Sequence, residues 1–187
     1  MNKPELRKFL LKKRNSLSRA EVLAASESII KDIENLIQKS GSMIILGFMP
    51  IGNEIDLRPL FENIINGYYK IKFNTDITLG LPRVCGREMR FFKVDSLKEL
   101  QKSSFGIMEP SLDSEEIIAK NAHVLVPLIG LNKDNKRLGF GGGFYDKYFG
   151  KHRDNILYGI AYDFQVDIDF DINEYDISMD YTFIARY

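Results

Sequence analysis

The chain has 187 residues, of which 44% are hydrophobic and 28% are charged, a composition that can bury a sizeable core in one domain spanning residues 1–187. Lysine plus arginine and aspartate plus glutamate each number 26, so the formal net charge is zero. This balance removes any global electrostatic reason to expect nucleic acid or an acidic membrane as a partner. We therefore expect small-molecule ligands at a local site.

Cysteine content and hydropathy exclude further classes of protein. Cys85 is the only cysteine and has no metal-ligand spacing around it, which argues against a disulfide scaffold and a zinc module. No apolar run approaches the roughly 20 residues that span a bilayer, and the basic N-terminal stretch lacks the apolar segment of a signal peptide. We expect a soluble, cytoplasmic monomer.

Two amphipathic helices are predicted at the start of the chain. The first covers residues 4–15, with Leu6, Phe9 and Leu10 facing inward. The second covers 18–39, opens with a Ser-x-x-Glu capping box and has apolar residues at three- and four-residue steps.

Strand and helix patterns alternate through the middle of the chain. A continuous apolar run over 43–49 predicts a strand that is buried on both faces, and helical spacing over 57–65 ends at Gly67. Three strand-like stretches follow, at 68–73, 79–84 and 89–94. A capping box formed by Ser96 and Glu99 then predicts a short helix.

The second half continues the alternation. A short helix near 114–120 precedes the most apolar strand, 124–131, which a glycine-rich turn and a helix follow at once. Late strands are predicted at 156–162 and 181–186. This order predicts an α/β fold, a single-domain three-layer sandwich with a mostly parallel, doubly wound sheet. Ligands of such sheets bind beyond the carboxyl ends of the strands.

The glycine-rich segment 137–146 is richest in chemical information. Four glycines in five residues leave backbone N–H groups bare, so that successive amides and a helix beginning near Gly143 can face an anion beside the Arg137 guanidinium. The segment is neither a Walker A loop nor a complete dinucleotide fingerprint, because Phe144 occupies the last glycine position. We interpret it as a phosphate cradle. The alternative is a tight turn that needs glycine for its conformation alone.

In order along the chain, these and other motifs resemble the 5-formyltetrahydrofolate cyclo-ligase family, also called methenyltetrahydrofolate synthetase. Segment 137–146 matches the family's Arg-Leu-Gly-aromatic-Gly-x-Gly-aromatic-Tyr-Asp pattern, and Lys3 and Arg7 match its N-terminal Lys-x-x-x-Arg spacing. Further matches are Phe48 with Pro50, Glu54-Ile55-Asp56, Leu81-Pro82-Arg83, Gly106-Ile107-Met108-Glu109-Pro110 and Val126-Pro127. Each piece is weak, but the ordered set is specific and spans nearly the full chain.

The resemblance implies an ATP site on the N-terminal helix and the glycine-rich segment. The implied ligands are Lys3, Arg7, Arg137, Leu138, Gly139, Phe140, Gly141, Gly142, Gly143, Phe144 and Tyr145. Two cations one helical turn apart lie on one face and can reach the same polyphosphate, which supports the pair Lys3 and Arg7 independently. The alternative for that pair is a solvated basic face.

By the same resemblance, Asp146 and Asp176 hold Mg2+, which prefers one or two carboxylates together with phosphate oxygens. Asp146 has the alternative of a first-turn acid that complements the helix dipole. The assignment of Asp176 depends on matching the family's His-Asp pair to Tyr175 and Asp176, in which the tyrosine departs from the family pattern.

The implied folate ligands are Glu54, Met49 and Tyr145. A carboxylate can accept pairs of pterin N–H donors, and Phe48, Phe140 or Tyr145 can stack on the ring. The alternatives are a surface-loop acid for Glu54 and a core residue for Met49.

The family reaction is the ATP-dependent conversion of 5-formyltetrahydrofolate to 5,10-methenyltetrahydrofolate through an N5-iminium phosphate, with release of ADP and phosphate. The resemblance makes Arg137 and Tyr145 the catalytic residues, and the chemistry requires no protein nucleophile. Two other classes stay open: a folate- or nucleotide-binding protein without turnover, and a sugar-phosphate isomerase-like enzyme, which has only fold analogy behind it. His123 and His152 are interpreted as structural residues.

Overall fold

The two N-terminal helices begin close to the predicted positions in the computed structural model, which describes residues 1–104 and 106–187. The Ser18 hydroxyl accepts a hydrogen bond from the backbone N–H of Glu21 at 3.2 Å, and the Glu21 carboxylate accepts one from the N–H of Ser18 at 2.7 Å. This pair satisfies two N–H groups that helix geometry leaves without acceptors. The first helix buries Leu6 and Leu10, but the inward placement of Phe9 is wrong, because its side chain is 55% exposed.

Helices alternate with strands at both ends of the chain, and the described residues of the middle, 76–138, contain strands and one 3-10 turn. The helices are α1 Lys3–Asn15, α2 Arg19–Ile37, α3 Arg58–Ile65, α4 Tyr68–Phe73 and α5 Phe144–Lys151, with 3-10 turns at Leu97–Glu99 and Asp163–Gln165. The strands are β1 Ser42–Leu46, β2 Asp76–Cys85, β3 Glu88–Lys93, β4 Gln101–Lys102, β5 Met108–Glu109, β6 Glu116–Ile117, β7 His123–Pro127, β8 Gly130–Leu131, β9 Arg137–Leu138, β10 Ile156–Tyr162 and β11 Tyr181–Ala185. None of the helices within the described ranges is long and apolar enough to cross a bilayer.

Seven of these strands form one sheet, in the order β11-β10-β7-β1-β2-β3-β6. The strands from β11 to β2 pair in parallel, whereas β3 and β6 join by antiparallel pairing. The predicted α/β fold with a mostly parallel sheet is confirmed.

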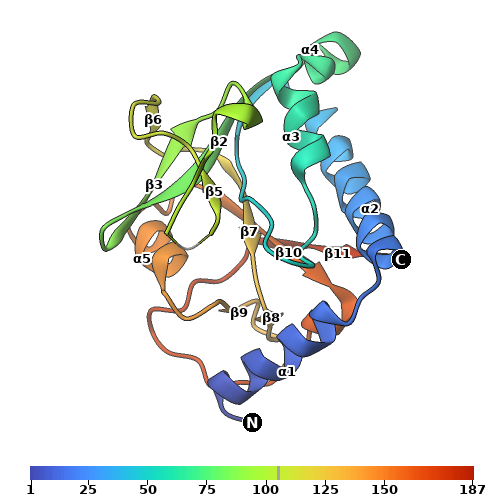
Figure 1. Ribbon diagram of the computed structural model, residues 1–187, viewed down its shortest axis with the longest axis vertical. Coiled ribbons are helices and arrows are strands. Elements are labelled where there is room, and N and C mark those ends of the chain that lie inside the picture. Colours follow the sequence, from blue (N-terminus) through green and yellow to red (C-terminus); the bar gives the residue numbers. More distant parts are fainter. Residues whose placement is uncertain (105) are drawn as a thin grey trace.

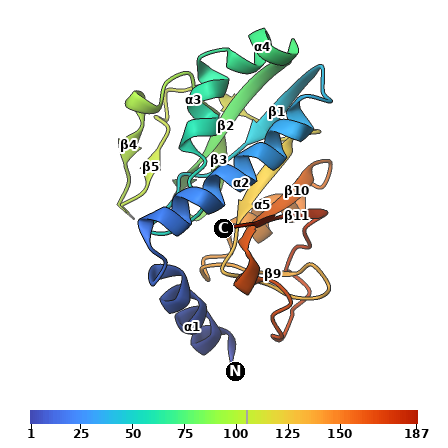
Figure 2. The ribbon, with the colours of Figure 1, turned by 90° about the vertical axis from the view of Figure 1, so that its right-hand side faces the viewer.

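Helices cover both faces of this sheet. Along β7, Leu125 packs into the apolar cluster beneath α2 and α3, whereas Val124 and Val126 point to the opposite face, where α5 packs. Figure 1 shows α2 and α3 on one side of the sheet and α5 on the other. Helix α1 belongs to neither layer: it lies at one end of the molecule (Figure 2) and packs Leu10 against Leu138.

Residues 68–73 form helix α4, so the predicted strand there is wrong. Tyr69, Ile71 and Phe73 alternate as in a strand, but Tyr69 and Phe73 are also four residues apart and stack with their ring centroids 6.1 Å apart. Ile71 is 86% exposed, and the Tyr69 hydroxyl donates a hydrogen bond to Glu34 of α2 at 2.8 Å. Six residues fit both periodicities, and contact with α2 selects the helix.

Three predictions between β3 and α5 also need correction. The segment 114–120 contains strand β6 in place of a helix, and β6 pairs with the edge that β3 would otherwise leave free. The strand predicted at 124–131 divides into β7 and β8, and β8 pairs in a hairpin with β9, the first two residues of the glycine-rich segment. The Ser96 hydroxyl accepts the N–H of Lys98, and a single 3-10 turn stands in place of the predicted capping-box helix.

Gly47 lies where the end of β1 approaches α3. A Cβ atom at this position would overlap the ring of Phe61, which is fully buried. We predict that Gly47→Ala lowers the free energy of unfolding by about 1–3 kcal/mol, as overpacking of a core does. Denaturant unfolding measures this change. Gly41→Ala is the matched control, because no described residue has an atom within 4 Å of its Cβ position, and an equal loss in both variants contradicts the prediction.

Candidate functional site

Two cavities meet at the carboxyl end of the parallel strands. A polar cleft of about 1050 Å³ lies between α1, the glycine-rich segment and the loop 173–178, and extends along α5 to the amino ends of β10 and β11. An apolar pocket of about 430 Å³ lies beside it and is lined mainly by hydrophobic side chains, among them Met49, Met89 and Phe140. Arg137 and Gly143 line both cavities, so ligands in the two cavities would be in reach of each other.

The glycine-rich segment forms the wall between these cavities. Leu138, Gly139, Gly141 and Asp146 line the polar cleft. The apolar pocket is lined by Phe140, Gly142, Phe144 and Tyr145. The structure therefore brings all the sequence-predicted residues of this segment to the site, but on two different sides of it.

The local structure explains why each of these positions in the wall is glycine. Gly141 and Gly143 have φ angles of +105° and +64°, which residues with a side chain rarely adopt. A Cβ atom on Gly139 would lie 2.8 Å from Nη1 of Arg137, and one on Gly142 would lie 2.9 Å from the Phe144 ring. The segment is therefore a conformationally demanding turn, and it also leaves the backbone N–H groups at the start of α5 without intrahelical acceptors.

Arg137 is held in a fixed position between the cavities. Its side chain is buried; Nη1 donates to the carbonyl oxygen of Pro127 at 3.2 Å, and Nη2 donates to Oδ2 of Asp146 at 2.9 Å. The guanidinium lies 5.0 Å from the centroid of the Tyr145 ring. Its Nε atom is buried and has no hydrogen-bond partner among the described residues. A preorganised cation at this point can stabilise negative charge on either side of the wall.

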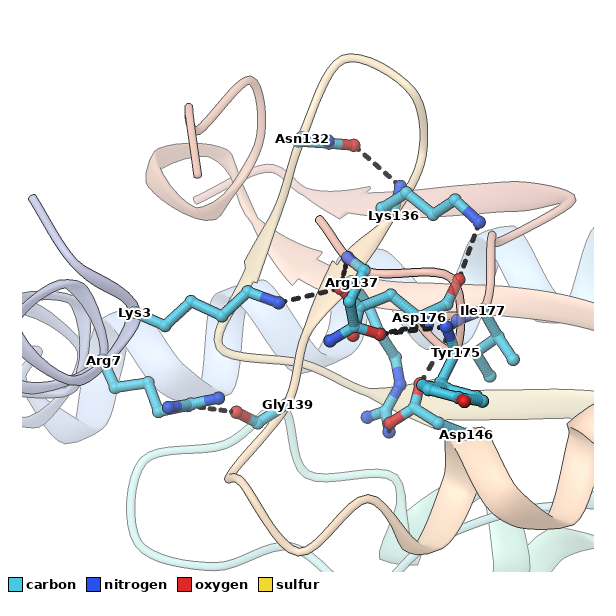
Figure 3. A network of polar contacts seen from close by, with 11 residues as sticks. Lys3, Arg7, Asn132, Lys136, Arg137, Gly139, Asp146, Tyr175, Asp176 and Ile177 are labelled. Atoms are coloured by element: carbon cyan, nitrogen blue, oxygen red, sulfur yellow. Dashed lines mark hydrogen bonds and ion pairs between the residues drawn. The ribbon is translucent and has the colours of Figure 1, made fainter. Parts of the chain in front are cut away.

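Helix α1 brings two further cations to the polar cleft. Lys3 and Arg7 lie one turn apart, and Figure 3 shows both side chains reaching from α1 toward the glycine-rich segment. Lys3 Nζ lies 2.8 Å from Oδ2 of Asp176, and Arg7 Nε donates to the carbonyl oxygen of Gly139 at 2.7 Å. The predicted alternative of a solvated basic face is wrong for this pair, because both side chains contact residues of the cleft.

Asp146 and Asp176 lie in the same polar network (Figure 3). Oδ1 of Asp146 accepts the N–H of Ile177 at 3.3 Å, which joins the start of α5 to the loop that carries Asp176. Burial raises the pKa of Asp176, but hydrogen bonds from Lys3 and the N–H of Asn173 outweigh it, and the pKa lies below its usual value. Asp176 is therefore ionised at neutral pH.

The two carboxylates have the right chemistry for a shared cation. No cluster of three or more His, Cys, Asp or Glu side chains that could hold a metal ion occurs within 1–104 and 106–187. A pair of carboxylates beside an anion site matches Mg2+, which commonly takes one or two carboxylates and completes its shell with phosphate oxygens and water. Asp146 and Asp176 fit this requirement. Tyr175, which is 75% exposed, lines the cleft next to them.

The Tyr145 hydroxyl stays protonated at neutral pH. Burial raises its pKa well above the ordinary value, and the nearby Arg137 guanidinium only partly opposes this rise. Tyr145 therefore offers a hydrogen-bond donor inside the apolar pocket, next to the cation that both cavities share.

Glu54 is a buried member of the apolar pocket, so its alternative as a surface-loop acid is wrong. Its Oε1 atom lies 3.2 Å from Nη1 of Arg14, and its Oε2 atom accepts the N–H of Ile51 at 2.9 Å. Strand β1 ends at Leu46, earlier than predicted, and Phe48 and Met49 leave the sheet to line the same pocket. A carboxylate in such surroundings is suited to recognise N–H donors on a flat, largely apolar ligand.

Several residues of the site had no role assigned to them from the sequence. Arg14, at the end of α1, is buried against Glu54. Glu109 lines the apolar pocket, and burial raises its pKa against the effects of the Val84 N–H and Arg83. Lys136 and Lys147 add positive charge to the cleft. The spacing of Arg14, seven residues after Arg7, was the one signal in the sequence that places it on the same helix face.

The histidines have structural contacts. Nδ1 of His123 lies 3.1 Å from the hydroxyl oxygen of Tyr158, and the two rings stack. His152 ends α5, with Nδ1 2.8 Å from the carbonyl oxygen of Tyr148.

Comparison with known proteins gives a consistent result. A family model described as the 5-formyltetrahydrofolate cyclo-ligase family matches residues 1–184. The chain is 30% identical over 182 residues to the 5-formyltetrahydrofolate cyclo-ligase of Mycoplasma pneumoniae, with 96% of each chain covered. It is 24% identical over 166 residues to the 5-formyltetrahydrofolate cyclo-ligase of Haemophilus influenzae, with 86% of each covered.

Solved structures show the same likeness. The NMR structure of 5,10-methenyltetrahydrofolate synthetase from Aquifex aeolicus has a TM-score of 0.83 and 32% identity, over 100% of this chain and 92% of that one. The structure of a 5,10-methenyltetrahydrofolate synthetase from Mycoplasma pneumoniae has a TM-score of 0.73 and 27% identity, over 97% and 98% of the two chains.

Proposed function

The chain belongs to the 5-formyltetrahydrofolate cyclo-ligase family, and from this premise we propose that it uses ATP and Mg2+ to convert 5-formyltetrahydrofolate to 5,10-methenyltetrahydrofolate. One observation supports the use of ATP in this proposal. A polar, cation-lined cleft and an apolar pocket meet at Arg137. That arrangement suits a reaction in which a phosphoryl group passes from a polyphosphate to a folate.

The polar cleft is the proposed ATP site. Lys3, Arg7 and Arg137 supply positive charge from two elements, and the glycine-rich segment supplies backbone N–H groups at the start of α5. Asp146 and Asp176 are the proposed Mg2+ ligands. The bound ion would neutralise charge on the phosphate oxygens during transfer.

The apolar pocket is the proposed folate site. The Phe140 ring provides a flat face for the pterin, Met49 provides further apolar surface, and the Glu54 carboxylate provides an acceptor for the pterin N–H groups. Tyr145 and Arg137 lie where this pocket meets the cleft, so the formyl group would face the γ-phosphate there.

The proposed reaction has two bond-making steps. The formyl oxygen attacks the γ-phosphorus, its bond to phosphorus forms as the bond to ADP breaks, and an N5-iminium phosphate results. N10 then attacks the formyl carbon, loses its proton, and the C–O bond breaks to release phosphate that carries the former formyl oxygen. Arg137 stabilises charge on the transferring group, and the protonated Tyr145 hydroxyl donates a hydrogen bond at the reacting centre.

The path of the oxygen atom tests this sequence of steps. Substrate with a heavy-oxygen label in the formyl group should give labelled phosphate, with one label for each ring that closes. Label released as water, with unlabelled phosphate, contradicts phosphorylation of the formyl oxygen. Stoichiometric binding without ADP formation would favour a binding protein instead.

The cations of α1 give a separate prediction. Lys3→Ala and Arg7→Ala should each raise the Kd for ATP by about tenfold or more, since a charge-assisted hydrogen bond contributes about 1.5–3 kcal/mol. Titration calorimetry with a non-hydrolysable ATP analogue measures the effect. Lys8→Ala is the matched control, because Lys8 is an exposed lysine of the same helix whose side chain leaves α1 in a different direction from Lys3 and Arg7. An equal loss in Lys8→Ala contradicts a specific phosphate site.

We further propose that residues 1–187 act as one domain, as a cytoplasmic monomer whose partners are these small molecules. Light scattering at working concentration measures the oligomeric state. A dimer would contradict the proposed monomer, and a dimer interface that includes part of either cavity would change the composition of the site.

A further inference from the structure

A buried ion pair joins the last turn of α1 to the loop that follows β1. Arg14 and Glu54 are only 4% and 5% exposed, and Nη1 of Arg14 lies 3.2 Å from Oε1 of Glu54. Taking a carboxylate out of water is costly unless a cation and hydrogen-bond donors replace the water. The guanidinium and the N–H of Ile51 are the replacements in this case.

A second set of contacts fixes the same loop to the same helix. The Asn53 side chain donates hydrogen bonds to the carbonyl oxygens of Arg14 at 3.2 Å and Leu17 at 2.9 Å. The backbone carbonyl of Asn53 accepts a hydrogen bond from the Tyr162 hydroxyl at 2.9 Å. The loop therefore has little freedom, and the direction of the Glu54 side chain depends on the end of α1.

Arg14 also belongs to the helix face that carries the cations of the polar cleft. Around the axis of α1, residues 3, 7 and 14 lie within about 40° of one another. Their side chains therefore leave the helix on one side. Lys3 and Arg7 reach the cleft, whereas the Arg14 guanidinium lies 5.5 Å from the ring centroid of Phe140, on the pocket side of the wall. One helix thus serves both cavities.

We propose that Arg14 is a positioning residue for the folate site: it holds the Glu54 carboxylate charged and directed into the apolar pocket without touching the substrate itself. This inference depends on the proposed function, since it needs Glu54 to be a folate ligand.

The charges around Glu54 explain why this role falls to Arg14. Burial raises the pKa of Glu54, and the Arg14 guanidinium opposes that rise most strongly. The charged and titratable groups around the carboxylate come from five elements: Arg14 of α1, Glu109 of β5, Arg137 of β9, Tyr145 of α5 and Tyr162 of β10. Arg137 is already paired with Asp146. Tyr145 and Tyr162 stay neutral because burial raises the pKa of each, and Glu109 adds no positive charge. Without Arg14, Glu54 keeps its proton to higher pH and loses its capacity to accept two N–H donors.

The test is the affinity for 5-formyltetrahydrofolate in the absence of ATP, measured by titration calorimetry between about pH 5 and 9, the range over which a buried glutamate can titrate. In Arg14→Gln, we expect the Kd for 5-formyltetrahydrofolate at neutral pH to rise about tenfold for each unit by which the pKa of Glu54 exceeds that pH. The folate affinity should recover as the pH increases. Arg14→Lys keeps the charge and should retain the flatter profile of the parent chain. Binding of an ATP analogue to the polar cleft should change little in either variant.

A double-mutant cycle makes the test independent of how well Arg14→Gln folds. In Glu54→Gln/Arg14→Gln neither member of the ion pair is charged, and the folate affinity should equal that of Glu54→Gln alone, because Arg14 acts through Glu54. A further loss in the double variant, or an Arg14→Gln profile parallel to that of the parent chain, overturns the positioning role while leaving the proposed function intact. A parent chain that binds no 5-formyltetrahydrofolate overturns both.

Discussion

Arg137→Ala is expected to lower the rate of ATP-dependent ring closure by about 10²–10³-fold, the usual cost of removing one preorganised charge contact at a developing anion. The size of the effect follows from the position of the guanidinium, which is 5% exposed and lines both cavities. A charge shielded from water interacts more strongly with a transferring phosphoryl group than an exposed charge does. Single-turnover kinetics with saturating ATP isolates the chemical step.

The control for this variant must address folding, because the change leaves Asp146 without its ion-pair partner. Arg137→Lys keeps a positive charge but loses the planar fork that contacts Pro127 and Asp146 together. We expect Arg137→Lys to fold and to remain well below the parent rate. Parent-like turnover in a folded Arg137→Ala variant contradicts a catalytic role for this residue.

Glu54→Gln is expected to raise the Kd for 5-formyltetrahydrofolate by about 10–100-fold, because a hydrogen bond to a charged group is worth about 1.5–3 kcal/mol. Glutamine keeps the shape of the side chain and can still accept a hydrogen bond from Arg14, so the fold should survive. It offers one acceptor oxygen in place of two. The Kd for an ATP analogue should stay near that of the parent chain, since Glu54 lines the apolar pocket and not the polar cleft.

The same variant separates binding from chemistry. If Glu54 acts by holding the folate, the rate at saturating folate should change far less than the affinity does. An unchanged folate Kd would remove Glu54 from the site, and with it the reason for a buried Arg14.

Local sequence patterns predicted much of the framework. The Ser18 capping box, the apolar run 43–49 and the glycine-rich segment are properties of a few neighbouring residues, and each one formed an element that begins close to the expected position. Segment 68–73 could not be assigned in this way, because its aromatic spacing fits a strand and a helix alike and its contact with Glu34 comes from a distant helix.

The site residues also divide into those that local sequence predicts and those whose place depends on distant contacts. Lys3 and Arg7 could be predicted as site residues because they lie one helical turn apart. Asp146 could be predicted because it ends a recognisable segment. Burial of Arg14 depends on its contact with Glu54, and burial of Glu109 depends on how β5 packs beside β2, where Arg83 donates a hydrogen bond to the carbonyl oxygen of Pro110. A charged residue is normally predicted to face water, so the buried charges were missed for a general reason.

The most direct test mixes the purified protein with 5-formyltetrahydrofolate, Mg2+ and ATP, and follows the absorbance of the methenyl product together with ADP release. Our account predicts product that requires ATP, forms with one ADP for each ring closed, and decreases sharply in Arg137→Ala. Product formed equally well without ATP, or no product from a folded chain that binds both ligands, would contradict it.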